Sequence, residues 1–488
     1  MNQIFIQPGD PNDNNRTYLP EEIRTSRMVV NENGNNSQVY PERLKEFKGP
    51  MGTEDEDVWY EYVPASYDSA KPTALVVSCH GGLMTGWGQA IYTSWTLVAD
   101  REGFICVFPN AHANRLWTLD QTPRQREIMS KIITGLPPVP ATDGSVSTFH
   151  DVRFITALIE EMKRKYNIDP GKVFIQGMSM GNAMTSMMAR NFGWKFAGAA
   201  GSGCPTDREQ LFRENGEVIE GRCALDVMVS RLEYDQVPPY MGDNKTTLLY
   251  NYHYWKEVNG CEDLPQISIR GDYNLLFLKG SEARFTVFDV KNRDHGQTFD
   301  DAELVWDYCF SGVMRDGEKL VHTKTSCFRE GDSLNIAAVD GGTKLWLNNQ
   351  IVEMDAPAFT WQKLKYHGLN GDSIVRGSYL YVPIRVLAKA FDAAITTEEN
   401  GNVVRLTLVE GTNVQFAKGS IGTVVDNRVE AMICEAVERD GELYIPMQWF
   451  LERFYGLHVS ECEGVTYATD HPARISTYTA WILEELLK

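Results

Sequence analysis

The amino-acid sequence predicts an α/β fold with a mostly parallel central sheet, followed by a smaller α+β domain. Short apolar runs alternate with helical patterns through residues 58–290, and a diverged repeat begins further along, where this alternation stops. The chain holds 488 residues. A domain usually holds about 100–200 residues, so more than one core is expected.

The parallel sheet is predicted from apolar runs with helices between them. Thr73–Cys79 is almost wholly apolar, as is typical of a strand buried on both faces of a parallel sheet. In the helical segment 147–166, Phe154, Leu158 and Met162 recur at every fourth position and share one face. Alternation of this kind indicates βαβ units. The other predicted strands are 58–64, 103–109, 173–175, 224–230 and 284–290, and the other predicted helices are 92–100 and 182–190.

A G-x-S-x-G motif, Gly177–Gly181, lies between a predicted strand and a predicted helix. In an α/β hydrolase this pattern forms the sharp turn that holds a serine out of the sheet. The motif alone is a weak signal, and the alternative is an ordinary glycine-rich turn. The strand before it and the helix after it favour an α/β hydrolase, with Ser179 as the candidate nucleophile.

A serine nucleophile needs a histidine base that a carboxylate orients, and α/β hydrolases place these groups in the chain order Ser, acid, His. His295 lies in a polar loop directly after a predicted strand and is the candidate base, whereas His253 falls in a predicted helix. Asp235 follows a predicted strand by a few residues and is the preferred acid. The competing carboxylates are Asp226, Asp243 and Glu233, of which Glu233 is the most serious rival.

Acyl transfer also needs hydrogen-bond donors for the negative oxygen of the tetrahedral intermediate. One expected donor is the N–H of Met180, the residue after the nucleophile. The other is expected from the loop that follows strand 73–79, through the N–H of Gly82 or Leu83. A simple tight turn is the alternative interpretation of this His-Gly-Gly sequence.

Composition excludes several classes of function. The formal net charge of -19 argues against nucleic acid or an anionic membrane as a partner. The nine cysteines are scattered without a C-x-x-C pair, so no metal site, redox motif or cofactor is expected, and both a reduced protein and one or two disulfides fit. No run approaches the ~20 apolar residues of a membrane helix. The N-terminus does not read as a signal peptide.

The last third of the chain contains two related segments. Tyr379–Phe391 resembles Glu442–Phe454, and their prolines, Pro383 and Pro446, lie 63 positions apart. Each copy is predicted to form a strand, a helix that begins at the proline, and further strands. Two copies predict a small α+β domain. A final helix is expected over Ser476–Lys488.

Residues 55–312 resemble the esterase/polyhydroxybutyrate-depolymerase family, which is related to feruloyl and acetylxylan esterases. The resemblance implies serine carboxylesterase activity, with Ser179, Asp235 and His295 in the triad positions. The segments that carry it are Cys79–Gly82, Gly103–Ala111, Asp151–Ile159, Tyr166–Phe174, the serine turn, Tyr254–Cys261 and Asp294–Gln297.

The C-terminal repeat is similar to the small domain named after the N-terminus of copper amine oxidase, a stalk module of Gram-positive surface proteins. Its Tyr-Val-Pro-Ile-Arg helix start, Tyr381–Arg385, carries the likeness. The name implies no copper here, because the sequence shows no His/Cys cluster. The module implies cell-surface or polysaccharide association, so an extracellular protein whose leader is missing from this chain is favoured over a cytoplasmic one.

The expected organisation has four parts. These are an N-terminal extension over 1–50, the catalytic domain over 51–316, a linker over 317–332 and the stalk-like domain over 333–488.

The substrate is expected to be an ester, either a small molecule or one linked to a polysaccharide. Residues expected to contact it are His80, Trp87, Trp117 and Met178, and the long loop 121–147 is a candidate cap. Plant-wall feruloyl or acetyl esters, other small acyl or aryl esters and polyesters all fit the sequence. Alternative functions are an attachment protein that has lost activity and a peptidase of the same fold.

Overall fold

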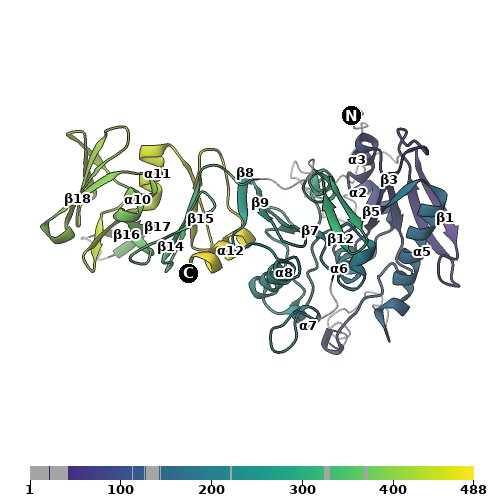
Figure 1. Cartoon of the computed structure of the whole chain (residues 1–488). Helices are drawn as coiled ribbons and strands as arrows, with labels where there is room; N and C mark the ends of the chain where they lie inside the picture. Colours follow the sequence, from purple (N-terminus) through teal and green to yellow (C-terminus); the bar gives the residue numbers. More distant parts are fainter. Residues whose placement is uncertain are drawn as a thin grey trace. The chain divides into compact units, whose positions relative to one another are not determined.

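The computed structural model describes residues 21, 42–112, 114–125, 127, 142, 144–219, 223–323, 330–367 and 372–488. The chain forms two compact units (Figure 1). Unit 1 holds Met1–Asp263 and Phe277–Arg329, and unit 2 holds Leu264–Leu276 and Glu330–Lys488. The division at Arg329 falls inside the expected linker 317–332. The excursion of Leu264–Leu276 into unit 2 is not predicted from the sequence.

Unit 1 is built on a sheet with the strand order β1-β2-β4-β3-β5-β6-β7-β10. Strands β4, β3, β5, β6, β7 and β10 pair in parallel, whereas β1 and β2 run antiparallel at one edge. The predicted mostly parallel sheet is therefore confirmed. The strands are β1 (Leu44–Gly49), β2 (Asp57–Tyr62), β3 (Thr73–Cys79), β4 (Ile105–Pro109), β5 (Ile168–Met178), β6 (Gly198–Ser202), β7 (Asp226–Leu232) and β10 (Phe285–Val290).

The central strands are apolar because the sheet is buried. Leu75, Val76 and Val77 of β3 are fully buried, and every residue of β10 is buried. Burying an apolar side chain of this size stabilises the fold by roughly 1.5–3 kcal/mol. Removing the apolar surface of these strands from water stabilises the sheet that carries the candidate site.

Helices connect the strands and pack on the sheet. Figure 1 shows α5 and α6 beside β5, and both helices contact that strand. The helices of unit 1 are α2 (Gly86–Tyr92), α3 (Trp95–Glu102), α5 (His150–Lys165), α6 (Met180–Phe192), α7 (Arg208–Leu211), α8 (Asn244–Val258) and α9 (Asp301–Val305), with a 3-10 turn at Val146–Thr148 and a π-helical turn at Trp306–Phe310.

The predicted helix 92–100 is in fact parts of two helices. Thr93 takes extended backbone angles after α2, and its hydroxyl donates a hydrogen bond of 2.8 Å to the carbonyl oxygen of Gln89. Ser94 then precedes the first residue of α3. The backbone N–H of Thr93 keeps its bond to the same carbonyl, and the Ser94 side chain makes no cap to α3, so the break lies in the extended backbone of Thr93.

Two segments outside the expected catalytic core join unit 1. Within the predicted extension 1–50, Leu44–Gly49 forms the edge strand β1. Within the predicted linker, β12 (Lys319–His322) pairs with β11 (Val313–Asp316) as an antiparallel hairpin. The rest of the extension, apart from Glu21 and residues 42–50, lies outside the described residues, as does most of the loop 121–147.

Unit 2 consists of antiparallel sheets with three helices among its described residues, α10 (Ile384–Ala390), α11 (Met447–Tyr455) and α12 (Thr477–Leu487). One sheet has the order β15-β14-β13-β26-β25, a second β16-β17-β24-β23 and a third β18-β19-β20-β21-β22. Residues Leu264–Leu276 of this unit hold β8 (Gln266–Arg270) and most of β9 (Tyr273–Leu278).

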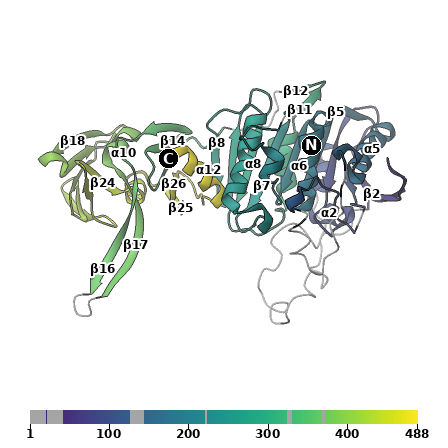
Figure 2. The same cartoon turned by 90° about the horizontal axis from the view of Figure 1, so that it is seen from below.

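The strands of the three sheets of unit 2 are β13 (Asn335–Val339), β14 (Lys344–Leu347), β15 (Gln350–Glu353), β16 (Phe359–His367), β17 (Asp372–Pro383), β18 (Ala394–Glu398), β19 (Val403–Thr407), β20 (Asn413–Ala417), β21 (Gly422–Val425), β22 (Arg428–Ala431), β23 (Val437–Arg439), β24 (Glu442–Pro446), β25 (His458–Cys462) and β26 (Val465–Thr469). Figure 2 shows β16 and β17 as a long two-stranded ribbon.

The predicted repeat forms equivalent structures in its two copies. Strand β17 runs into α10, and β24 runs into α11. The two strands pair antiparallel, with Val382 opposite Ile445 and Pro383 opposite Tyr444. The prolines are the N-cap residues of these helices, so each helix begins one residue after its proline, and not at the proline as the sequence suggested.

The remaining expectations from the sequence concern the last helix, the cysteines and membranes. Helix α12 follows its N-cap residue Ser476 as predicted. The eight cysteines that the structure describes are all free thiols, and Cys327 lies outside the described residues. Within the described residues, no helix has the length and apolar character needed to cross a membrane.

Candidate active site

Ser179, Asp235 and His295 follow strands of the same sheet. Ser179 comes directly after β5, whereas Asp235 lies just beyond β7 and His295 just beyond β10. These strands run parallel with β6, so all their carboxyl ends lie at one edge of the sheet. Ligand sites of open α/β sheets form at this edge.

The serine turn is strained and depends on its glycines. Ser179 has φ 55° and ψ -121°, a conformation that few non-glycine residues adopt. A Cβ atom on Gly177 would come within 2.1 Å of the Gly181 carbonyl oxygen, and one on Gly181 would come within 2.2 Å of the Cys79 carbonyl oxygen. The Ser179 N–H donates to the Ser202 carbonyl oxygen at 2.7 Å, and the Ser179 side chain does not cap helix α6.

Asp235 and His295 form a hydrogen-bonded pair. The Nδ1 of His295 lies 2.8 Å from Oδ1 of Asp235, whose side chain is almost fully buried. This hydrogen bond is the largest influence that raises the pKa of His295 above its ordinary value, against the opposing effect of burial. The buried guanidinium of Arg231 lies 3.3 Å from Oδ2 of Asp235.

The end of strand β6 connects the serine turn to this pair. The Ser202 carbonyl accepts the Ser179 N–H, and the Ser202 hydroxyl donates to the carbonyl of Gly296, next to His295. A Cβ atom on Gly203 would lie 3.0 Å from Cε1 of His295 and 3.3 Å from Oδ2 of Asp235. The Ser202–Gly203 segment therefore lies beside the backbone of Ser179 and beside the Asp235–His295 pair.

The predicted donors for an oxyanion lie close to one another. Met180 is the first residue of α6, where backbone N–H groups have no partner inside the helix. A Cβ atom on Gly82 would be 3.5 Å from the sulfur of Met180, so the two residues are neighbours. Leu83, the alternative to Gly82, has its N–H engaged, since it donates to the Arg115 carbonyl oxygen at 2.9 Å.

His80 is a structural residue, which corrects its expected contact with substrate. Its side chain is fully buried, Nδ1 lies 2.6 Å from the Gly81 carbonyl oxygen, and Nε2 accepts the Ala111 N–H at 2.9 Å. Nε2 therefore carries no proton. Burial lowers the pKa of His80 to about 4, so the ring is neutral.

Trp117, which was expected to stack on the substrate, is also fully buried in this structure. Its indole N–H donates to the His80 carbonyl oxygen at 2.8 Å, and the two rings have centroids 4.8 Å apart. Met178 is buried as well, against Gly81. Trp87, at the start of α2, remains 44% exposed and is the one of the four predicted contact residues that is open to a ligand.

The competing acids and base have other partners. Asp226, the first residue of β7, accepts hydrogen bonds from His322 and from the backbone N–H of Arg284. Glu233 lies 2.9 Å from the Lys291 ammonium and accepts the Asn292 N–H. Asp243 caps helix α8, in which His253 is exposed.

Sequence reasoning missed two groups that support the site. Arg231 is a charged residue inside an apolar strand, and this contrast is the one signal that pointed to it. The second group is a buried chain of hydrogen bonds in which Gln297, two residues after His295, joins Gln89 and Asp301. Burial raises the pKa of Asp301 to about 6.

Apart from the Ser179 site, the described part of the chain holds a group of side chains with the arrangement of metal ligands. Ligand atoms of Asp55, His112 and His150 all lie within 4.8 Å of one another. None of these residues belongs to the Ser179 site. No pattern in the sequence pointed to this group, because its members are far apart in the chain.

The chain is similar to curated esterases. It is 30% identical over 148 residues to feruloyl esterase B of Neurospora crassa, which covers 30% of this chain and 43% of that protein. It is 26% identical over 125 residues to a bifunctional acetylxylan esterase/xylanase of Neocallimastix patriciarum, over 25% of this chain and 14% of that protein. The predicted resemblance is confirmed. The chain spans less than half the length of each of these relatives.

A poly(3-hydroxyalkanoate) depolymerase of Paucimonas lemoignei is 27% identical over 141 residues, or 29% of this chain and 30% of that protein. Residues 369–463 match the copper amine oxidase N-terminal domain, which confirms the second resemblance. Among solved structures, an acetyl xylan esterase from Aspergillus awamori aligns with a TM-score of 0.36 at 16% identity, over 54% of this chain and 98% of that one.

Proposed function

We propose that the protein is a serine carboxylic-ester hydrolase that works through an acyl-enzyme. The observation that carries the proposal is the hydrogen-bonded Asp235–His295 pair, which lies beside Gly203. The residue before Gly203 is Ser202, whose carbonyl oxygen accepts the N–H of Ser179. The similarity to feruloyl and acetylxylan esterases supports the same reaction class.

In the first half of the reaction, the Ser179 hydroxyl attacks the ester carbonyl while Nε2 of His295 takes its proton. Asp235 holds Nδ1 and stabilises the imidazolium that forms. The N–H groups of Met180 and Gly82 receive the negative oxygen of the tetrahedral intermediate. Collapse releases the alcohol, which takes the proton from His295.

In the second half, water attacks the acyl-enzyme and gives its proton to His295. The second tetrahedral intermediate expels Ser179, which recovers a proton from the imidazolium, and the carboxylic acid leaves. No other co-reactant is needed. The neutral form of His295 starts both halves, so the raised pKa of this residue means that activity falls at mildly acidic pH.

The proposed substrates are feruloyl, acetyl or other small acyl and aryl esters, including those carried by plant-wall polysaccharides, and polyesters. Exposed Trp87 supports an aromatic or sugar group in the substrate. The module over residues 369–463 supports a cell-surface or extracellular location and attachment to polysaccharide.

The test is hydrolysis of 4-nitrophenyl acetate and methyl ferulate by the wild type, Ser179→Ala and His295→Ala. We expect both variants to lose at least about 10³-fold in kcat. His253→Ala replaces an exposed histidine of α8 and serves as the matched control with wild-type rates. An inactive attachment protein would give no turnover that depends on Ser179. A peptidase would cleave peptide substrates in preference to both esters.

A further inference from the structure

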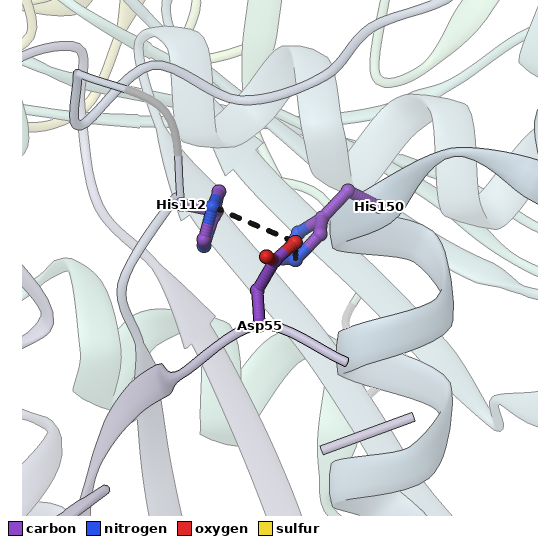
Figure 3. Close-up of side chains that lie close together, drawn as sticks. All are labelled: Asp55, His112 and His150. Carbon is purple, nitrogen blue, oxygen red and sulfur yellow. Dashed lines mark ion pairs between the residues drawn. The ribbon is translucent and has the colours of Figure 1, made fainter. Parts of the chain in front are cut away.

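Three side chains from separate parts of unit 1 meet around one point. Asp55 lies in the loop before β2, His112 follows β4, and His150 is the first residue of α5. Figure 3 shows the two imidazole rings with the Asp55 carboxylate beside them. A fourth group, the fully buried Asp57 carboxylate at the start of β2, faces both rings.

The distances between these groups are those between ligands of one small metal ion. Nε2 of His150 lies 3.5 Å from Oδ2 of Asp55 and 3.4 Å from Oδ1 of Asp57. The two nitrogens of His112 face different oxygens, since Nε2 lies 3.8 Å from Oδ2 of Asp55 and Nδ1 lies 3.7 Å from Oδ1 of Asp57. An imidazole binds an ion through one nitrogen, so the three groups that can share one ion are Asp55, His112 and His150, and Asp57 lies beside them. Zinc binds such atoms at about 2.0–2.2 Å in a tetrahedron, in which neighbouring ligand atoms are roughly 3.4 Å apart.

Two of the inward-facing atoms are buried and have no hydrogen-bond partner among the described residues. They are Oδ1 of Asp57 and Nε2 of His150. The other oxygen of Asp57 accepts from the Thr53 hydroxyl, so only Oδ1 is unsatisfied. A buried carboxylate oxygen without a partner is costly, and a cation between it and the imidazole nitrogen would satisfy both atoms.

His150 is held as a metal-binding histidine is normally held. Its Nδ1 lies 3.2 Å from Oδ1 of Asp151, and the side chain of Asp151 is fully buried. A carboxylate on the outer nitrogen fixes the tautomer and directs the lone pair of the other nitrogen toward the ion. Asp151 also accepts the backbone N–H groups of His112, at 3.3 Å, and Thr118, at 2.7 Å.

We propose that Asp55, His112 and His150 form a binding site for Zn²⁺, with the buried Asp57 carboxylate beside it. Two imidazoles favour zinc over calcium or magnesium, which prefer oxygen ligands alone. The role of the ion is structural, because it joins the loop before β2, the loop after β4 and the beginning of α5. It involves none of the residues of the proposed esterase reaction.

The test uses the full chain, first freed of metal with a chelator and then titrated with Zn²⁺ alone. We expect one tightly held zinc per chain, measured by elemental mass spectrometry, and a thermal unfolding midpoint that rises by several degrees with zinc. Asp55→Ala and His112→Ala remove exposed ligands and therefore leave the fold intact. Each should weaken zinc binding by more than about a hundredfold.

Matched controls are Asp263→Ala and His253→Ala, which remove an exposed acid and an exposed histidine elsewhere in unit 1. Both should bind zinc as the wild type does. The proposal is overturned if the wild type binds no zinc, or if Asp55→Ala and His112→Ala keep the wild-type affinity. Metal content and unfolding are measured without an ester, so a failure of the esterase proposal leaves this result unaffected.

Discussion

Gly203 offers a test of whether the end of β6 places the catalytic groups. The residue has φ +71°, and Gly203→Ala would put a methyl group 3.0 Å from Cε1 of His295. Ordinary contact begins at 3.4 Å, so His295 would have to retreat by about 0.4 Å. Its hydrogen bond to Asp235 would be disturbed by the same movement, because the methyl group also lies 3.3 Å from Oδ2 of Asp235.

The expected size of the effect follows from this displacement. A misplacement of about 1 Å typically costs about 10²-fold in rate, so 0.4 Å is expected to cost roughly tenfold in kcat/KM. Tenfold corresponds to about 1.4 kcal/mol of lost transition-state stabilisation. Alanine in the left-handed region also destabilises the fold by roughly 1–2 kcal/mol, independently of His295.

Gly216→Ala separates these two effects. Gly216 has φ +88°, and a Cβ atom there has nothing within 4 Å. Both variants should therefore lose similar stability in urea unfolding, but only Gly203→Ala should lose activity on 4-nitrophenyl acetate. If Gly203→Ala hydrolyses this ester as fast as Gly216→Ala, the end of β6 does not position His295, and our account of the site is wrong.

Three further predictions concern titration. The positive charge of Arg231 lowers the pKa of His295, so Arg231→Met should move the acid limb of the kcat/KM profile to higher pH, and Arg231→Lys should restore it. Burial lowers the pKa of His80 to about 4, so the free energy of unfolding should fall by up to about 3 kcal/mol as pH falls from 6.5 to 4. In urea unfolding, His80→Gln should abolish this dependence of stability on pH. Burial raises the pKa of Asp301 to about 6, so the folded state favours the neutral acid. The free energy of unfolding should therefore fall by up to about 3 kcal/mol as pH rises from 3.8 to 6, and Asp301→Asn should remove that loss.

The fold of unit 1 was largely predictable because the signals are local. Strand β3 occupies the predicted residues Thr73–Cys79, since a short continuous apolar run between turn residues is typical of a buried strand. The assignment of Leu264–Leu276 to unit 2 was not predictable, because it depends on the contacts of the whole fold and not on a pattern within the segment. The boundary between α2 and α3 lies in the extended backbone of Thr93, where the sequence predicted one continuous helix.

The candidate site was predictable as far as chain order and strand ends determine it. Glu233 lies one residue and Asp235 three residues beyond the end of β7, so both were candidates. The structure shows that Glu233 pairs with Lys291 and that Asp235 pairs with His295. The proposed zinc ligands gave no signal, because residues 55, 112 and 150 have no common spacing. Their meeting depends on the fold as a whole.

The loop after β4 explains why residues that looked like substrate contacts are buried instead. Ala111 and Trp117 bind the ring and the carbonyl of His80, and the Arg115 carbonyl takes the N–H of Leu83. The His80 side chain and the backbone of the His-Gly-Gly segment are therefore bound by the loop after β4, and Gly82 lies next to Met180. Since the same loop is anchored to α5 through Asp151, beside the proposed zinc site, removing the metal should loosen the oxyanion donors more than the Asp235–His295 pair. Loss of zinc is then expected to lower kcat while the pH dependence set by His295 stays unchanged.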